Sequence, residues 1–313
     1  MNKKRRSRYR KGFLICFLAI ISALAILYIL HSDKSKRIAG EGLEREDELK
    51  RTAHRIYRSP DLQKKPATPE LISPAKKKIA IIIDDIGCDL APVRELLSVD
   101  VPIAFSILPY CPYSLEASEM IHRTGKEVLL HLPMEPHAYP EVKPGPGALL
   151  LSMEDHELRQ QMEKDIHNVH YIKGVNNHMG SKFMEDEGKL SVVLSYLKEK
   201  GFYFVDSRTT SHSKGQEVSK KIGLRFLSRD VFIDNNQDYT FILDTLNHLS
   251  EKKDPQNKDP FLIIGHPYPS TIEALKKAIP HLKAKGIDIV PVSEMIDIAA
   301  RKNKFSFKGA LFN

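Results

Sequence analysis

From Lys78 onward, short apolar runs alternate with stretches of helical periodicity, and this alternation constrains the fold more than any other feature of the chain. The runs are rich in β-branched and aromatic residues and are bounded by Gly, Pro and Asp, as is typical of buried parallel strands. They lie at Ile79–Ile83, Pro102–Leu108, Glu127–Leu130, Gly174–Asn176, Tyr203–Val205, Leu224–Leu227, Phe261–Ile264 and Ile287–Val290. Seven or eight strand–helix units over about 225 residues predict an α/β architecture, either a barrel or a doubly wound sheet.

Polar side chains stand at the ends of five of these runs. The carboxyl ends of parallel strands lie at one face of an α/β domain, so these side chains are expected to converge there. A single histidine at such a position is more typical of a hydrogen-bonded core residue, but the whole set predicts a metal or catalytic site. The residues are Asp84, Asp85, His131, His178, Asp206 and His266.

Mixed aspartate and histidine ligands suit a divalent metal, with zinc favoured. A metal with an open coordination position, a carboxylate base and a histidine acid would hydrolyse an amide or an ester. Competing signatures are missing from the sequence: it has no G-x-x-x-x-G-K-[ST] phosphate loop, no H-E-x-x-H and no G-x-S-x-G. The strand that ends in two aspartates is therefore not expected to bind a nucleotide.

Five short motifs occur in a fixed order at these strand ends: IIIDDIG, HLPMEP, NNHMGS, DSRT and IGHP. In this order they resemble the divergent polysaccharide deacetylases, distant relatives of the carbohydrate esterase family four deacetylases. The resemblance spans Lys78 to Ile296, which is essentially the whole predicted domain. It implies a distorted (β/α) barrel, usually with seven strands rather than eight.

The resemblance also implies roles for single residues. In the Asp-Asp pair, the first residue, Asp84, matches the catalytic base, and the second, Asp85, matches a metal ligand. His131 matches a second metal ligand. His266, on the last strand, matches the general acid.

The third metal ligand departs from the family pattern. The classical enzymes have a second histidine in an H-x-x-x-H spacing, but the sequence has Glu135 at that position. We therefore expect His178 to be the third ligand, with Glu135 as the second candidate for that role. Glu135, Asp206 and Arg208 are also candidate substrate-binding residues, and Arg208 either orients Asp206 or contacts substrate.

The N-terminal region indicates export. Residues 1–11 carry seven positive charges and no negative one, and residues 12–30 are almost entirely apolar and long enough to span a bilayer. The positive-inside rule and the lack of an Ala-x-Ala site favour an uncleaved signal anchor over a cleaved signal peptide. A charged, Pro-containing linker at 31–75, a catalytic domain at 76–300 and a tail at 301–313 are expected to follow.

Charge and cysteine content add two expectations. The net charge of +8 falls to about +1 without the seven N-terminal cations, which argues against a nucleic-acid-binding domain. Cys88 and Cys111 follow adjacent predicted strands, so a disulfide is geometrically feasible, but two unpaired, partly buried thiols are favoured.

These observations predict an exported, metal-dependent hydrolase that removes acetyl groups from a cell-envelope polysaccharide. It would be a single-pass protein of the inner membrane, with its C-terminal domain on the periplasmic or extracytoplasmic side. The alternative is a catalytically degenerate protein of the same fold that binds an envelope glycan or a protein partner. The broken H-x-x-x-H pattern motivates this alternative.

Overall fold

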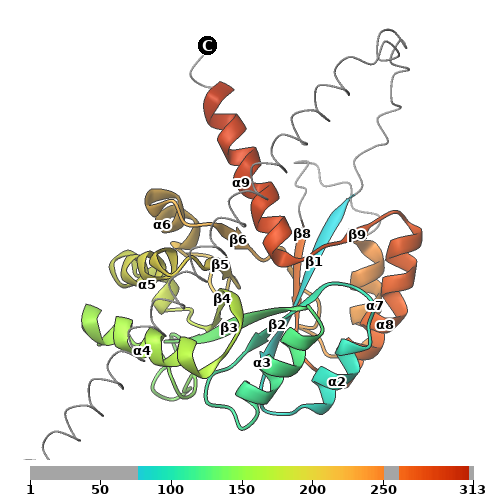
Figure 1. The fold of residues 1–313 in the computed structure, drawn as a ribbon, viewed down its shortest axis with the longest axis horizontal. Coiled ribbons are helices and arrows are strands. Elements are labelled where there is room, and N and C mark those ends of the chain that lie inside the picture. Colours follow the sequence, from blue (N-terminus) through green and yellow to red (C-terminus); the bar gives the residue numbers. More distant parts are fainter. Residues whose placement is uncertain (1–76, 250–260, 310–313) are drawn as a thin grey trace, which may run out of the picture. The chain divides into compact units, whose positions relative to one another are not determined.

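The computed structural model describes residues 77–249 and 261–309, with side chains described as far as Arg301. Strands and helices alternate along the chain, and the helices lie outside a curled sheet (Figure 1). The strands are β1 (Lys78–Ile86), β2 (Ile103–Ile107), β3 (Glu127–Met134), β4 (Ile172–Met179), β5 (Tyr203–Asp206), β6 (Phe226–Ser228), β7 (Val231–Phe232), β8 (Phe261–Gly265) and β9 (Asp288–Ile289). The helices are α2 (Ala91–Leu97), α3 (Ser114–Arg123), α4 (Asp155–Asn168), the 3₁₀ turn η2 (Phe183–Glu185), α5 (Glu187–Glu199), α6 (Gly215–Ile222), α7 (Tyr239–His248), α8 (Pro269–Ala284) and α9 (Val292–Gly309).

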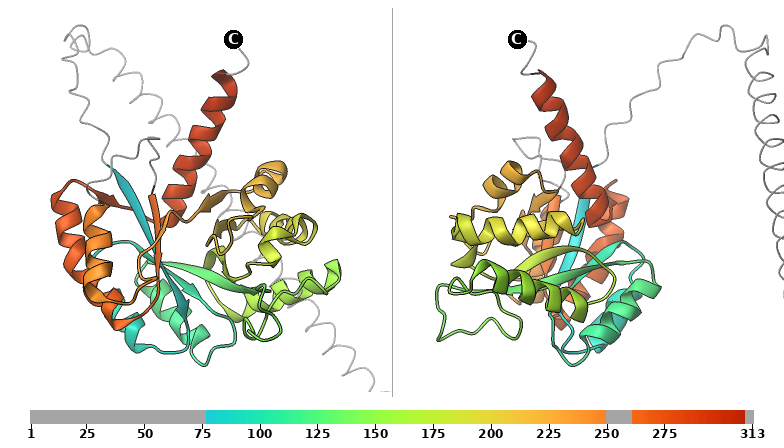
Figure 2. Two further views of the ribbon diagram at one scale, coloured as in Figure 1. Left: turned by 180° about the vertical axis from the view of Figure 1, so that it is seen from behind. Right: turned by 60° about the vertical axis from the view of Figure 1, so that its left-hand side comes forward.

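The sheet is parallel throughout and has the order β6-β5-β4-β3-β2-β1-β8-β7, with β9 added beside β1. Its two edge strands, β6 and β7, are separated in the chain by Arg229 and Asp230 alone. The amide of Arg229 donates to the carbonyl of Asp206, the last residue of β5, and the amide of Asp230 donates to the carbonyl of Leu262 in β8. The two edges of the sheet therefore meet at one segment, which requires a strongly curled sheet (Figure 2). This curled parallel α/β sheet is the expected barrel type and not an open doubly wound sheet.

The apolar runs are continuous because both faces of the strands are buried. Along β1, Ile79, Ile81 and Ile83 belong to the core shared with the outer helices. Ala80 and Ile82 belong to a second, smaller core inside the curl, to which Val292, Met295 and Ile296 of α9 also contribute. Alternate residues of a strand point to opposite faces, so a strand between two cores has apolar residues at every position.

Several strands extend beyond the predicted apolar runs. β1, β3 and β4 continue into the polar residues that follow those runs, so Asp84, Asp85, His131 and His178 lie within the ends of strands. The two-residue strand β7 was not predicted. Helix α9 runs to Gly309 and so continues through residue 300, where the domain was expected to end.

Cys88 and Cys111 form a disulfide. The preference for two free thiols was therefore wrong. The two cysteines follow the neighbouring parallel strands β1 and β2, and this places their Cα atoms 5.1 Å apart. No helix among residues 77–249 and 261–309 is both long and apolar enough to cross a membrane, and the predicted signal anchor at 12–30 lies outside these ranges.

Candidate metal centre

The end of β1 places two adjacent carboxylates in the mouth of the curled sheet. The pairing of β1 with β2 shifts register between Ile83 and Ile86, and Asp85 has a positive φ of 56°. In a regular strand the two aspartates would point to opposite faces. Here Asp84 is buried, with 1% of its surface exposed, while the side chain of Asp85 is 34% exposed. The irregular end of β1 thus gives one enclosed carboxylate and one that reaches solvent.

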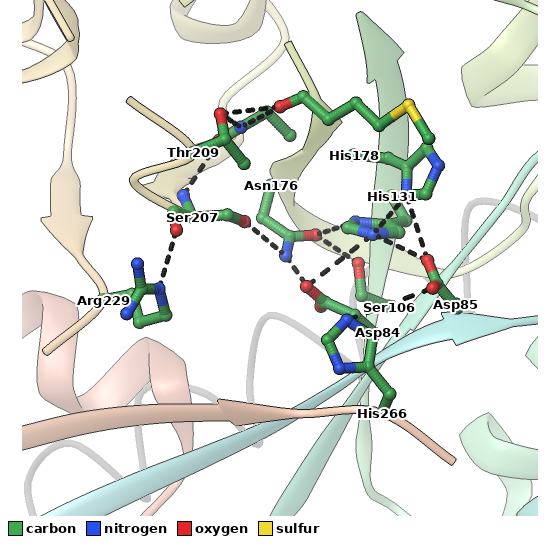
Figure 3. A network of polar contacts seen from close by, with 12 residues as sticks. Asp84, Asp85, Ser106, His131, Asn176, His178, Ser207, Thr209, Arg229 and His266 are labelled. Atoms are coloured by element: carbon green, nitrogen blue, oxygen red, sulfur yellow. Dashed lines mark hydrogen bonds and ion pairs between the residues drawn. The ribbon is translucent and has the colours of Figure 1, made fainter. Parts of the chain in front are cut away.

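Asp85, His131 and His178 bring one ligand atom each to a common point (Figure 3). Oδ1 of Asp85 lies 3.2 Å from Nε2 of His131 and 3.0 Å from Nδ1 of His178. The two ring nitrogens are 3.2 Å apart. These are the three residues that the sequence predicts as metal ligands.

The dimensions of this triangle fit a divalent cation. Tetrahedral zinc with bonds of about 2.0–2.2 Å separates its ligand atoms by about 3.3–3.5 Å, close to the three distances here. Oδ1 of Asp85 is buried and accepts no well-aligned hydrogen bond, although both ring nitrogens lie beside it. Three ligand atoms converge, and two of them belong to the partly exposed side chains of Asp85 and His178. This arrangement suits a metal with its fourth position open to solvent.

The electrostatics of the cluster favour a cation as well. Burial raises the pKa of Asp84 above its usual range. Burial also acts to raise the pKa of Asp85, but close contacts with His131 and His178 outweigh it and hold that pKa well below the usual range. For His131, burial is outweighed by the two carboxylates, which raise its pKa to about 9. A metal ion that binds at His131 must displace this proton.

Asn176 orients both a ligand and a carboxylate, and the sequence did not reveal it. Its side-chain oxygen lies 3.0 Å from Nδ1 of His131, and its Nδ2 donates to Oδ1 of Asp84 at 2.8 Å. Ser106 donates to the same side-chain oxygen. With the proton of His131 on Nδ1, Nε2 keeps its lone pair for a metal. The available signal was the two-residue period that places Asn176 and His178 on one face of β4.

His266 follows β8 and is held by Asp234, a second residue that sequence reasoning missed. Oδ1 of Asp234 lies 2.9 Å from Nδ1 of His266, and Oδ2 accepts from the amide of His266 and, at 2.8 Å, from Thr271. Burial would lower the pKa of His266, but Asp234 raises it above the usual value. Nε2 of His266 faces the cluster, 4.0 Å from Oδ2 of Asp85.

The other predicted residues lie around this centre. Glu135 is buried, and its two oxygens bind the Lys182 ammonium after β4 at 2.6 Å and the amide of Leu151 in the loop after β3 at 2.7 Å. The carboxylate of Asp206 accepts from the amide of Arg208 at 2.7 Å and from Ser213 at 2.6 Å. The side chain of Arg208 is exposed. Their substrate-binding roles stay predictions.

A curled parallel sheet with an aspartate and histidine cluster at its carboxyl end can be compared with known proteins. The model of the divergent polysaccharide deacetylase family matches residues 81–296. This match covers more than half of the chain, and the protein belongs to that family.

Individual relatives are moderately similar. The protein YibQ of Escherichia coli, described as uncharacterised, is 29% identical over 220 residues, which cover 70% of this chain and 67% of YibQ. The crystal structure of the uncharacterised protein ATU2773 from Agrobacterium tumefaciens is 22% identical, with a TM-score of 0.65 over 70% of this chain and 89% of that one. At this identity the likeness shows the fold alone.

Proposed function

We propose that the protein is a metal-dependent hydrolase that removes acetyl groups from a cell-envelope polysaccharide. The observation that carries the proposal is the triangle of Asp85, His131 and His178, with the buried carboxylate of Asp84 and the ring of His266 beside it. Family membership supports a polysaccharide as the substrate. Zinc is the metal that this donor set favours.

The groups around the triangle have the properties that amide hydrolysis requires. Asp85, His131 and His178 would hold a divalent cation, which would polarise the acetyl carbonyl and lower the pKa of water. Asp84 accepts the proton of the attacking water, and its raised pKa makes it a stronger base than an exposed aspartate. His266 donates a proton to the departing sugar nitrogen, and the Asp234 carboxylate keeps its ring charged and oriented until that step.

The catalytically degenerate alternative is based on Glu135, which replaces the second histidine of the family motif. His178 reaches the same cluster from β4, so three donors converge without a residue at position 135. A non-catalytic glycan-binding or partner-binding role is therefore the second outcome of the experiment below.

We also propose that the domain works outside the cytoplasm, tethered to the inner membrane by residues 12–30. The Cys88–Cys111 disulfide supports this location, because disulfides persist in oxidising compartments. The basic residues 1–11 before the apolar run support a cytoplasmic N-terminus.

The test combines metal analysis with an activity assay on the full chain purified in detergent. We expect about one equivalent of zinc or a similar ion per chain, and acetate release from N-acetylglucosamine oligomers. His131→Ala should lose both, whereas His122→Ala, which changes a histidine on α3 stacked against Tyr171, should keep both. A metal-free wild type that stays inactive after metal loading would contradict the proposal and favour the binding role.

A further inference from the structure

A small polar cavity lies where the two edges of the sheet meet. It has a volume of about 280 Å³ and is called the seam cavity below; its lining residues are Arg208, Thr210, Ser211, Arg229 and Asp230. Arg208, Thr210 and Ser211 come from the loop after β5, and Arg229 and Asp230 join β6 to β7. Two loops that build one cavity beside the metal cluster could hold part of a substrate.

The cavity carries positive charge that the protein does not neutralise by ion pairs. Among the described residues, no carboxylate forms an ion pair with Arg208 or Arg229. Within the part of the chain that the structure describes, Arg229 donates only to carbonyls, at 2.7 Å to Ser207 and 3.1 Å to Arg208. The carboxylate of Asp230 accepts from the amide of Leu262 in β8 at 2.7 Å. Burial and the neighbouring Arg208 together lower the pKa of Arg229, although Asp206, Asp84 and Asp230 act in the opposite direction.

The seam cavity is connected to the catalytic residues by direct contacts. The guanidinium of Arg229 lies 3.8 Å from the ring centre of Phe232, and Phe232 stacks on the ring of His266 with centres 5.6 Å apart. On its other side Arg229 contacts Ser207, whose hydroxyl accepts from Asn176 at 3.2 Å (Figure 3). Arg229 is thus separated from His266 by one residue, Phe232, and from Asn176 by one residue, Ser207.

We propose that the seam cavity binds the anionic group of an acidic glycan. The inference rests on the proposed function for the acetylated sugar and narrows its substrate to a polysaccharide that carries carboxylate or phosphate groups. Two adjacent guanidinium groups present forked donors that match either anion. An anion between them would also relieve their mutual repulsion, which gives an acidic glycan an advantage over a neutral one.

The test compares two hexasaccharides that both carry N-acetyl groups, using calorimetry on the full chain. Chitohexaose is neutral, and a hyaluronan hexasaccharide carries carboxylates. We expect wild type to bind the acidic oligomer about tenfold or more tightly, and Arg208→Gln to lose that preference because a charge-assisted hydrogen bond is lost. Arg208 is exposed, so this variant leaves the core intact. Arg94→Gln, which changes an exposed arginine on α2, is the matched control and should keep the preference.

Inorganic phosphate distinguishes the two anion sources. Stronger Arg208-dependent binding of phosphate than of the carboxylate oligomer would assign a phosphate-bearing glycan. The inference is overturned if neither anion binds in an Arg208-dependent way at millimolar concentration, or if Arg208→Gln and Arg229→Lys both keep the wild-type preference. Acetate release from chitohexaose by the wild type tests the proposed function separately, since this neutral oligomer carries no anionic group for the seam cavity.

Discussion

Each end of the curled sheet has a carboxylate with buried oxygen atoms, but the two carboxylates differ in their hydrogen-bond partners. At the end where the strands begin, Glu127 is 4% exposed, and its carboxylate is surrounded by donors. It accepts from the hydroxyl and, at 3.1 Å, the amide of Ser293, contacts the Tyr203 hydroxyl at 3.5 Å, and lies 3.7 Å from the Lys173 ammonium. At the end where the strands finish, Oδ1 of Asp85 lies beside ring nitrogens of His131 and His178. This oxygen accepts no well-aligned hydrogen bond.

This difference shows which kind of buried polarity indicates function. A carboxylate with a full set of donors stabilises the fold and has no lone pair left for a ligand. A carboxylate whose neighbours are themselves ligand atoms has unused lone pairs that converge. We therefore interpret the base of the sheet, around Glu127, as structural, and its mouth, around Asp85, as the candidate site.

The largest effect is expected from removing a ligand atom at the mouth of the sheet. Asp85→Ala removes one of three ligand atoms, and we expect acetate release to fall by at least about a thousandfold, with loss of the bound metal. Elemental analysis and the acetate assay measure the two effects. Asp297→Ala, which changes an exposed aspartate on α9 near the base, is the control and should leave both unchanged. Full activity in Asp85→Ala would show that the cluster is not the reaction centre.

The next effect concerns the residue that positions His266. Asp234→Asn removes the carboxylate that raises the pKa of His266, so the ring loses its proton at lower pH. We expect kcat/KM to fall by about ten- to a hundredfold and the alkaline limb of its pH profile to move to lower pH.

Asp238→Asn is a suitable control, because Asp238 caps helix α7 through the amide of Phe241 and does not touch His266. An Asp234→Asn profile that keeps its alkaline limb while the rate falls would assign Asp234 a purely structural role.

Much of the fold could be predicted from the sequence because buried parallel strands leave a strong local signal. The run at Ile79–Ile83 is apolar at every position since β1 lies between two cores. β7 was missed because two residues, Val231 and Phe232, are too few for any periodicity. Its place in the sheet depends on Leu262 and Ile264 of β8, which are distant in sequence.

The site was predictable only where its residues directly follow such runs. Asp85, His131 and His178 follow apolar strand patterns, and the structure brings them together as expected. Asp234 follows the undetected strand β7, so nothing local indicated it. The Cys88–Cys111 disulfide was not predicted, because its formation depends on the distance between two loops, which the sequence does not give.

Asp165, a buried carboxylate on a helix outside the sheet, sharpens the comparison between the two ends. Asp165 on α4 is fully buried; one oxygen accepts from Gln161 at 2.8 Å and the other has no hydrogen-bond partner. Like Asp85, Asp165 has a buried oxygen without an aligned hydrogen bond. Unlike Asp85, it is not part of a cluster of converging ligand atoms among the described residues. Burial raises its pKa to about 7, above the usual 3.8, so folding favours the protonated form.

The contribution of Asp165 to the stability of the wild type should therefore fall as the pH rises from about 4 to 7, because the unfolded chain releases this proton first. We expect Asp165→Asn to increase the free energy of unfolding at pH 8, on the order of 2 kcal/mol, and to change it little at pH 4. Urea denaturation at the two pH values measures the difference between variant and wild type. An equal effect at both values would show that the charge of Asp165 is not the cause.

The smallest expected effect is at the base. Glu127→Gln keeps the shape of the side chain but replaces an acceptor oxygen with an amino group that must face Ser293 or Tyr203, so about one hydrogen bond is lost. We expect the free energy of unfolding to fall by about 1 kcal/mol, with kcat/KM for acetate release unchanged. Tyr203→Phe, which removes the weaker contact at 3.5 Å, should cost less. If Glu127→Gln instead lost activity while keeping its stability, the base of the sheet would be coupled to the reaction. The number of hydrogen-bond donors around a carboxylate would then no longer distinguish a structural carboxylate from a functional one.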